Sequence, residues 1–323
     1  MRKQPQQILL TGGTGSFGHA FVEHALGRND TSVLRIYSRD ELKQYEMAQR
    51  FGQHPRLRFL LGDVRDRQRL ARAMHGVDLV VHAAAMKQVP LCEYNPAEAV
   101  KTNIIGAQNV IDCAIDAGVP RTVALSTDKA VNPANLYGAT KLCAEKLFVQ
   151  GNVYAGPRNF RFSCVRYGNV IGSRGSVIPL FRKQAETGVL TLTDERMTRF
   201  WISLPQAIEF VWLAVTQMSG GEIFVPKIPS MRVADLARAI APDALLKEVG
   251  CRPGEKIHEL LLTAEEAEAT REYPTYFIVG GADPQPGGRP VPAGFSYASD
   301  RNTQWLDVDQ LGEMVASLEM CGA

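Results

Sequence analysis

A glycine-rich turn near the N-terminus places the strongest constraint on how this chain can fold. The segment TGGTGSFG (11–18) follows the apolar run Ile8–Thr11 and precedes a helical pattern. Its glycines satisfy the spacing G-x-G-x-x-G from Gly13 to Gly18. Such a turn lets backbone N–H groups and a helix N-terminus approach a pyrophosphate. Its position at the first strand–helix junction favours a dinucleotide site over an ordinary loop.

Short apolar runs alternate with helix-length segments through the first half of the chain. Helical patterns such as Ala97–Ala117 and Tyr137–Val149 separate the runs. This alternation is typical of βαβ units around a parallel sheet. The predicted fold class is therefore α/β, a Rossmann-like doubly wound parallel sheet with a smaller C-terminal substrate-binding domain. The predicted strands are Ile8–Thr11, Val33–Ser38, Leu57–Val64, Val77–Ala85, Thr122–Thr127 and Phe162–Tyr167.

The alternation stops after Gly168, and this break predicts a second unit. A helical pattern near Leu204–Met218, a short strand at Glu222–Val225 and a helix near Met231–Ile240 follow. The Pro- and Gly-rich segment 280–294 predicts a loop. The predicted domains are a dinucleotide-binding domain of residues 1–168 plus about 203–221, and a substrate-binding domain of about 169–202 and 222–323.

Composition and charge limit the class of protein. Hydrophobic residues make up 45% and charged residues 22%, as in ordinary globular enzymes. The net charge of +2 gives no reason to expect nucleic acid or an anionic membrane as partner. The six cysteines include no C-x-x-C pair and the histidines show no metal spacing, so no metal site is predicted. The start MRKQPQQILLTGG has only three consecutive apolar residues and predicts neither a signal peptide nor a membrane anchor. We expect a soluble cytoplasmic protein.

The end of the second predicted strand bears on which dinucleotide binds. An NAD site commonly has a carboxylate there, which holds the adenosine ribose 2′-OH. Here Arg39 arrives where a 2′-phosphate would lie, and Lys43 is one helical turn away. NADP is therefore favoured, although Asp40 leaves NAD as the alternative. The predicted cofactor-binding residues are Gly12, Thr14, Gly15, Ser16, Phe17, Gly18, Ser38, Arg39, Asp40, Lys43, Asp63, Val64, Ala83, Ala85, Lys87, Ser126, Tyr137 and Lys141.

A polar cluster precedes a Y-x-x-x-K pair in the segment 122–141. The apolar run ends in Ser-Thr-Asp-Lys (126–129), and Tyr137 and Lys141 follow. On a helix, residues i and i+4 share a face, so the lysine can lie beneath the phenol. Free tyrosine has a pKa near ~10, and a cation at about 5 Å lowers it by about two pKa units at an effective dielectric constant of about 20. The pair predicts a tyrosine base that deprotonates an alcohol while its carbon gives a hydride to NADP.

These motifs, together with others in the same order, resemble one enzyme family. The chain is similar to extended short-chain dehydrogenase/reductases, and specifically to the inverting UDP-N-acetylglucosamine 4,6-dehydratases. The region around 264–298 matches no motif of that family. The family's larger relatives carry transmembrane helices, whereas this chain resembles the short form that serves pseudaminic acid synthesis. The matching segments are TGGTGSFG, YSRDELKQ, GDVRD, HAAAMKQVP, NPAEAVKTNIIGA, LSTDKAVNP, LYGATK, RYGNVIGSRGSV, TDERMTRFWI, GEIFVPKIPSM, RPGEKIHE and DRNTQWL.

The resemblance implies a three-stage reaction that yields UDP-2-acetamido-2,6-dideoxy-β-L-arabino-hex-4-ulose. Tyr137 takes the proton of the sugar 4-OH during C4 oxidation, and Thr127 binds the 4-oxygen. Lys129 is the implied base at C5 and Asp128 the implied acid for the departing 6-OH, although which of the two makes each transfer stays open. Burial or neighbouring cations must lower the pKa of Lys129 for it to act as base. The implied catalytic residues are Thr127, Asp128, Lys129, Tyr137 and Lys141.

The resemblance also implies UDP-N-acetylglucosamine as substrate and a homo-oligomer, a dimer or larger. The guanidinium groups of Arg199 and Arg252 suit a diphosphate. Two alternatives remain: a UDP-sugar 4-epimerase, which needs the same tyrosine and lysine but no acid/base pair for C5 and C6, and a non-catalytic NADP-sensing protein. The implied substrate-binding residues are Lys87, Asn169, Val170, Arg174, Arg199, Arg252 and Glu255.

Overall fold

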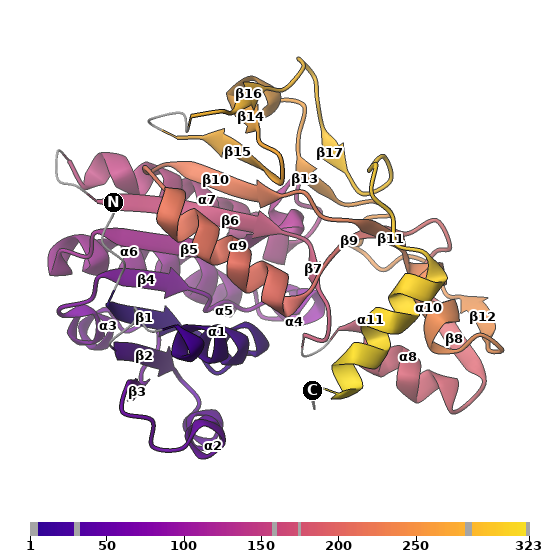
Figure 1. The fold of residues 1–323 in the computed structure, drawn as a ribbon, viewed down its shortest axis with the longest axis horizontal. Helices are drawn as coiled ribbons and strands as arrows, with labels where there is room; N and C mark the ends of the chain where they lie inside the picture. The colour runs from indigo at the N-terminus through magenta and orange to yellow at the C-terminus, as the bar shows by residue number, and fades with distance from the viewer. Residues whose placement is uncertain (1–5, 29–32, 157–159, 174–175, 282–285, 321–323) are drawn as a thin grey trace.

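A large, mostly parallel sheet forms the centre of the protein (Figure 1). The computed structural model describes residues 6–28, 33–156, 160–173, 176–281 and 286–320. Within these residues the sheet consists of β1 (Gln7–Thr11), β2 (Val33–Ser38), β3 (Leu57–Leu61), β4 (Leu79–His82), β5 (Arg121–Thr127), β6 (Arg161–Tyr167), β10 (Glu222–Pro226), β14 (Thr270–Glu272), β15 (Tyr276–Gly280) and β16 (Arg289–Pro290).

The strand order confirms the predicted Rossmann-like doubly wound fold. The order is β16-β14-β15-β10-β6-β5-β4-β1-β2-β3, and every pair from β3 to β10 is parallel. The chain leaves β1 on one side for β2 and β3 and returns to its other side for β4, which creates a crevice at the carboxyl ends of these strands. The last three strands continue the sheet in antiparallel fashion.

Helices cover both faces of the sheet, which explains why its inner strands are apolar without alternation. One face carries α1 (Ser16–Gly27) and α9 (Leu204–Gln217), which contact each other (Figure 1). The other carries α3 (Arg67–Met74), α6 (Gly106–Ala117) and α7 (Leu136–Tyr154). α2 (Glu41–Phe51) follows β2 and packs beside β3 at the edge of the sheet.

A second apolar core lies beside the sheet. Phe181, Leu190, Trp201, Leu236 and Leu311 are buried together in it. The yellow helix α11 (Val308–Met320) crosses this unit in Figure 1 and packs on α10 (Val233–Ile240). The elements around this core are β7 (Asn169–Val170), α8 (Val177–Ala185), β8 (Val189–Leu192), β9 (Thr198–Ile202), β11 (Ser230–Arg232), α10 (Val233–Ile240), β12 (Leu245–Glu248) and α11 (Val308–Met320).

The two predicted units share the sheet more closely than a simple division suggests. β10 belongs to a segment predicted for the second unit, yet it pairs with β6 in the large sheet. β13 (Leu260–Leu262) pairs with β17 (Tyr297–Ala298), and Leu261 and Tyr297 are buried in the main core. The exact division into domains stays a prediction. A parallel strand can return to a sheet from any distance along the chain, so local patterning does not reveal its neighbour.

Several local predictions differ in detail from the structure, and the strands β3 and β4 are shorter than the predicted Leu57–Val64 and Val77–Ala85. The predicted helix Ala97–Ala117 consists of α5 (Pro96–Val100) and α6, joined by a π-helical turn at Lys101–Ile105. The predicted helix at Met231 starts only at Val233, because Met231 pairs with Arg199 in β11. The predicted loop 280–294 contains the two-residue strand β16, and its residues 282–285 lie outside the described part.

Over the described residues, no helix has the length and apolar character that crossing a bilayer requires.

A buried ion network ties the sheet to α7. Arg166 on β6 is 1% exposed and donates to both carboxylate oxygens of Glu145, at 2.9 and 2.7 Å. The same guanidinium donates to Glu266 and to the carbonyl of Leu261. All three guanidinium nitrogens of Arg166 therefore donate hydrogen bonds, and a buried charge needs such partners.

Replacing Arg166 should test how much this network stabilises the fold. Arg166→Met leaves the buried Glu145 carboxylate without a cation, so we expect the free energy of unfolding to fall by about 3–5 kcal/mol in urea titrations. Arg238→Met is the control, because Arg238 forms an exposed ion pair with Asp235 on one helix and should change stability by less than about 1 kcal/mol. Equal stability of the two variants would contradict the assignment.

Candidate active site

One large cavity lies at the carboxyl ends of the parallel strands. Its volume is ≈ 1140 Å³. The β1–α1 turn, the ends of β2, β4 and β5, the start of α7 and the segment 252–259 all contribute to its wall. Ligands of open α/β sheets bind at this edge, where the strand order reverses.

The glycine turn forms one end of the cavity. Gly12 has φ +67°, and a Cβ there would lie 2.8 Å from the Ala84 backbone at the end of β4. A Cβ on Gly18 would lie 1.9 Å from the Gly13 carbonyl oxygen, so this position packs α1 against the turn. No side chain caps the start of α1 at Gly15. The uncapped N-terminus of this helix thus borders the cavity and suits an anionic ligand.

At the end of β2, Arg39 lines the cavity, whereas the neighbouring Asp40 carboxylate bonds to Lys43 of α2. Asp40 caps α2, accepting from the Lys43 backbone N–H at 3.0 Å, and pairs with the Lys43 ammonium at 3.0 Å. The backbone hydrogen bond from Lys43, together with the charge of its side chain, lowers the pKa of Asp40. Arg39 is half-exposed, and its Nη1 lies 3.7 Å from the Asp63 carboxylate.

The turn after β5 and the first turn of α7 lie in direct contact. The Asn135 side chain caps α7, accepting from the Gly138 N–H at 2.8 Å. A Cβ on Gly138 would lie 2.1 Å from the carbonyl oxygen of Lys129, so glycine alone allows this approach. Tyr137, next to that glycine, is therefore held beside the Asp128–Ala130 turn.

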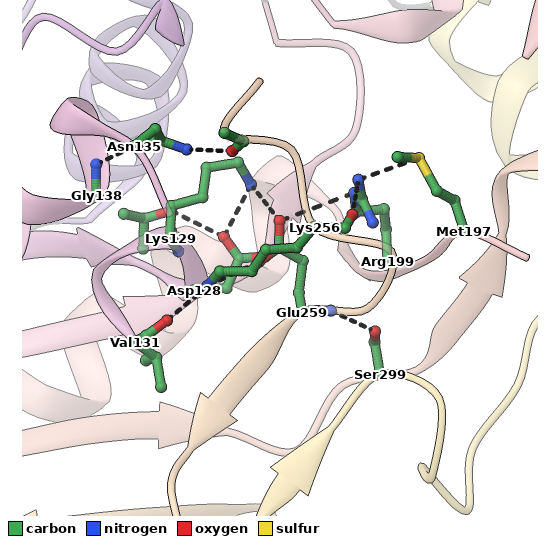
Figure 2. A network of polar contacts seen from close by, with 12 residues as sticks. Asp128, Lys129, Val131, Asn135, Gly138, Met197, Arg199, Lys256, Glu259 and Ser299 are labelled. Carbon is green, nitrogen blue, oxygen red and sulfur yellow. Dashed lines mark hydrogen bonds and ion pairs between the residues drawn. The ribbon is translucent and has the colours of Figure 1, made fainter. Parts of the chain in front are cut away.

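Lys129 lies between two buried carboxylates (Figure 2). Its Nζ is 3.0 Å from Asp128 Oδ1 and 3.4 Å from Glu259 Oε1. Asp128 is fully buried and also accepts from the Thr127 hydroxyl at 2.9 Å. Lys129, Thr127 and Glu259 line the cavity, whereas Asp128 does not.

The charges around Lys129 act against the lowered pKa that its predicted role as a base requires. Burial works against its charge, but Asp128 and Glu259 outweigh burial and raise the pKa of Lys129 above its ordinary value. The expected lowering is therefore not found, because the two nearest charges are anions. Burial also raises the pKa of Asp128. Glu259 is buried too, but the charges of Lys129, Arg199 and Lys256 outweigh its burial and hold its pKa below the ordinary value.

Tyr137 is a neutral phenol in this structure. Burial raises its pKa to about 12, against the lowering by the charge of Lys129 and by the Thr127 hydroxyl. The leading cation is thus Lys129 rather than the predicted Lys141. Lys141 Nζ donates to the Leu125 carbonyl oxygen at 2.7 Å, and burial lowers the pKa of Lys141. Additional positive charge in the cavity is needed before the phenol can act as a base at neutral pH.

The structure brings most of the predicted site residues to this one cavity. Gly18 and Asp128 lie behind its wall, and Arg174 lies outside the described residues. The predicted residues that line it are Gly12, Thr14, Gly15, Ser16, Phe17, Ser38, Arg39, Asp40, Lys43, Asp63, Val64, Ala83, Ala85, Lys87, Ser126, Thr127, Lys129, Tyr137, Lys141, Asn169, Val170, Arg199, Arg252 and Glu255.

Arg199 differs from the prediction of a diphosphate ligand. Its Nη1 donates to the carbonyl oxygens of Thr198 and Ile257, and its Nη2 donates to that of Lys256 at 2.9 Å. Both terminal nitrogens therefore hold the segment around Lys256 in place. Arg252 is exposed on the cavity wall, and its role as a diphosphate ligand stays a prediction.

Sequence reasoning missed Glu259, Lys256 and Asn135. Glu259 and Lys256 stand in the quoted segment RPGEKIHE, but only the position of the segment in the fold reveals that Glu259 pairs with Lys129 and that Lys256 pairs with Glu259. Asn135 Nδ2 donates to the Gly254 carbonyl oxygen at 2.9 Å and so joins α7 to that segment. An asparagine directly before a helical pattern is a recognisable capping signal.

Several buried polar atoms of the cavity residues have no hydrogen-bond partner. They are Thr102 Oγ1, Ser126 Oγ, Asn169 Oδ1, Ser176 Oγ and Glu259 Oε2. Buried polar atoms are normally satisfied, so this concentration indicates that a polar ligand completes the site.

The comparisons with known proteins agree with this geometry. Residues 8–280 match the family described as polysaccharide biosynthesis protein. The chain is 49% identical, over 97% of its length and 98% of the relative, to a protein of Campylobacter jejuni subsp. jejuni serotype O:2 named UDP-N-acetylglucosamine 4,6-dehydratase (inverting). The chain belongs to the family of the inverting UDP-N-acetylglucosamine 4,6-dehydratases. The family resemblance of its sequence is thereby confirmed.

Other relatives of this dehydratase-family chain carry a different name. A protein of Rickettsia conorii named UDP-glucose 4-epimerase is 40% identical over 97% of the chain and 96% of that protein. The X-ray structure of Pen from Bacillus thuringiensis is 37% identical with a TM-score of 0.92, covering 99% of this chain and 100% of that one. The fold is therefore shared along the whole length.

The buried charges around Lys129 predict a pH-dependent loss of stability in Lys129→Met. Without the cation, Asp128 and Glu259 face each other, so we expect a loss of about 3–5 kcal/mol at pH 8. Burial and Glu259 already raise the pKa of Asp128 above its unfolded value, and the loss of Lys129 raises it further, so the destabilisation should shrink as the pH falls towards 5 and Asp128 binds a proton. Urea unfolding at the two pH values measures this change.

The surface variant Lys101→Met serves as the control for that experiment. Lys101 pairs with Glu98 at 3.1 Å on the protein surface, so its loss should change stability little at either pH. A loss in Lys129→Met that is the same at pH 5 and pH 8 would speak against buried, charged carboxyls beside Lys129.

Proposed function

We propose that this protein is an NADP-dependent UDP-N-acetylglucosamine 4,6-dehydratase that inverts C5. The observation that carries the proposal is the Asp128–Lys129 pair beside Tyr137 in a cavity that also contains a dinucleotide-type glycine turn. The name of the Campylobacter jejuni relative supports the substrate and the stereochemical course. The product would be UDP-2-acetamido-2,6-dideoxy-β-L-arabino-hex-4-ulose.

The cavity residues fit a dinucleotide. The uncapped start of α1 suits the pyrophosphate, and the close approach of Gly12 to Ala84 leaves room for it. When bound, NADP would accept the C4 hydride and later return it to C6. The residues Gly12, Ser38, Arg39, Asp63 and Ser126, with the other cavity residues named above, would hold it.

Tyr137 would remove the proton of the sugar 4-OH. Its pKa of about 12 keeps the proton on the phenol until further positive charge arrives. An oxidised nicotinamide carries such a charge, and Lys129 and Thr127 already favour the phenolate. Lys141 would support the site by bonding the Leu125 carbonyl beneath the helix.

Elimination would use Lys129 and Asp128 together. A 4-ketone acidifies the C5 proton, and loss of this proton and of the 6-OH forms the C5–C6 double bond and water. Transfer of one proton from Lys129 Nζ to Asp128 Oδ1, across their 3.0 Å hydrogen bond, produces a neutral amine and a carboxylic acid at once. These are the two states that the step requires. Burial raises the pKa of Asp128, which favours this transfer, whereas Asp128 and Glu259 raise the pKa of Lys129, which opposes it.

Proton delivery to the leaving hydroxyl would pass through Thr127. Asp128 lies behind the cavity wall, whereas Thr127 lines the cavity and its hydroxyl is 2.9 Å from Asp128 Oδ1. The amine takes the C5 proton and the acid supplies the proton of the departing water. Return of a proton to C5 from the opposite face would then invert that centre.

Substrate binding would use polar groups of the same cavity wall. Arg252 is placed for the diphosphate, and Asn169 offers an unpartnered Oδ1. Lys87 is exposed on the cavity wall, and partial desolvation there lowers its pKa. Val170 and Glu255 also line the cavity.

A UDP-sugar 4-epimerase is the second candidate. The 40% identity to the Rickettsia conorii protein favours it. An epimerase has no use for an acid/base pair at C5 and C6, and Lys129 beside Asp128 supplies one. A non-catalytic NADP-sensing protein would not need Tyr137 at the cavity.

Incubation with UDP-N-acetylglucosamine in D₂O distinguishes these functions. We expect NMR to detect a 4-keto, 6-deoxy product with deuterium at C5 and inverted configuration there, because the C5 proton leaves and a solvent deuteron returns. Tyr137→Phe should lower the rate by at least about 100-fold, as expected for loss of a general base. Inversion at C4 without deuterium at C5 would support the epimerase, and unchanged turnover by Tyr137→Phe would refute the role of the phenol.

The preference for NADP should depend on Arg39. Because Asp40 is engaged in capping α2, Arg39 is the group placed to meet a 2′-phosphate. Arg39→Ala should weaken NADP binding by about 10-fold or more and leave NAD binding nearly unchanged, as measured by calorimetry. Arg50→Ala is the matched control, since exposed Arg50 pairs with Glu23 outside the cavity. Equal losses for the two dinucleotides would contradict the proposed contact.

We also propose that the enzyme acts in the cytoplasm, towards pseudaminic acid and surface glycans, as a homo-oligomer. The family resemblance supports the pathway. Exposed apolar side chains on α4 (Val89–Tyr94) support association, with Leu91 55% and Tyr94 85% exposed.

A further inference from the structure

Glu259 is a buried carboxylate that reaches Lys129 from a distant segment of the chain. It is 2% exposed. Its Oε1 lies 3.4 Å from Lys129 Nζ and 3.9 Å from Arg199 Nε. Its Oε2 lies 3.6 Å from Lys256 Nζ and has no hydrogen-bond partner. Figure 2 shows its side chain pointing towards Lys129, on the side away from Ser299.

The backbone holds this carboxylate in place. The N–H of Glu259 donates to Ser299 Oγ at 2.9 Å, and the N–H of Ser299 donates to the Glu259 carbonyl oxygen at 2.8 Å. Lys256 Nζ donates to the Val131 carbonyl oxygen at 2.6 Å. The segment is thus attached on one side to Ser299 and on the other to the turn that carries Lys129.

A second buried glutamate shows what a purely structural role looks like. Glu222 is 1% exposed, accepts from Ser163 Oγ at 2.6 Å and from the Gly220 N–H at 2.8 Å, and does not line the active-site cavity. Its two oxygens satisfy the backbone and a neighbouring strand. Glu259 instead lines the cavity and offers its charge to Lys129, with one oxygen left unbonded.

We propose that Glu259 is a positioning residue that holds Lys129 against Asp128 and sets the pH range in which this pair exchanges its proton. The inference rests on the proposed dehydratase function, since the pair is the acid/base group of that reaction. Glu259 acts through Lys129 and needs no contact with the sugar.

The sign of the effect follows from the charges that face Lys129. An anion favours the protonated form of every group near it, so Glu259 raises the pKa of both Lys129 and Asp128. Removing its charge should lower both values and move the active range to lower pH. The titratable and charged groups around Lys129 are Asp128, Tyr137, Arg199, Lys256 and Glu259.

The test is the pH profile of kcat/KM for dehydration of UDP-N-acetylglucosamine by the full chain. We expect the profile of Glu259→Gln to move to lower pH by about one unit or more, because a charge within 4 Å is lost. Glu259→Asp keeps the charge and should keep the position of the profile while lowering kcat. Glu222→Gln, the matched buried control, should lower Tm and leave the profile in place.

A variant of the opposite sign tests the inference even if Glu259→Gln folds poorly. Lys256→Met removes the cation beside Glu259 Oε2, so the anion acts more strongly on Lys129 and the profile should move to higher pH. Profiles of Glu259→Gln and wild type that coincide, or a Lys256→Met profile displaced downwards, would overturn the proposal.

A titration without turnover separates this inference from the proposed function. The ¹³Cε resonance of Lys129, assigned with Lys129→Met, should titrate at lower pH in Glu259→Gln than in wild type. No turnover by wild type, together with this shift, would refute the dehydratase assignment alone. Turnover by wild type with an unmoved resonance and an unmoved profile would refute the role of Glu259 alone.

Discussion

The first turn of α7 lies against the Asp128–Ala130 turn, and the arrangement of the site depends on this contact. Gly138 makes it possible, because any side chain there would collide with the Lys129 carbonyl oxygen. Asn135 fixes where the helix begins. The contact brings Tyr137, Thr127 and Lys129 to one cavity, although they belong to a helix, a strand end and a turn, respectively. Chemistry at one sugar carbon and its neighbours needs this proximity.

Burial makes the charges of the cluster strong and mutually dependent. Lys129, Asp128 and Glu259 share little water, so each charge shifts the protonation of the others more than surface charges would. The arrangement keeps the lysine charged and raises the pKa of Asp128. A single proton moving between the two side chains changes the pair from an ion pair into a base and an acid. A distant segment of the chain contributes to this balance through Glu259.

Local sequence signals anticipated much of this architecture. The apolar runs anticipated β1 to β6. Among these, β1, β4 and β5 contain few polar residues because they lie inside the sheet with both faces covered. The glycine turn and the Y-x-x-x-K pair correctly predicted parts of the cavity wall. Their spacing fixes which residues lie close together within a single turn or on one face of a single helix. The place of β10 beside β6 and the two-residue strand β16 were not anticipated, because pairing partners come from remote segments.

The fold class, the glycine turn and the helical spacing of Tyr137 and Lys141 follow from local sequence, because steric limits and periodicity act over a few residues. The charge state of the site depends instead on the folded chain as a whole, and the fold sets it through contacts between distant segments. It engaged Arg199 with carbonyl oxygens, joined Lys141 to Leu125 and brought Glu259 to Lys129. Electrostatic energy sums over every neighbour in space, and those neighbours come from segments that no local pattern connects.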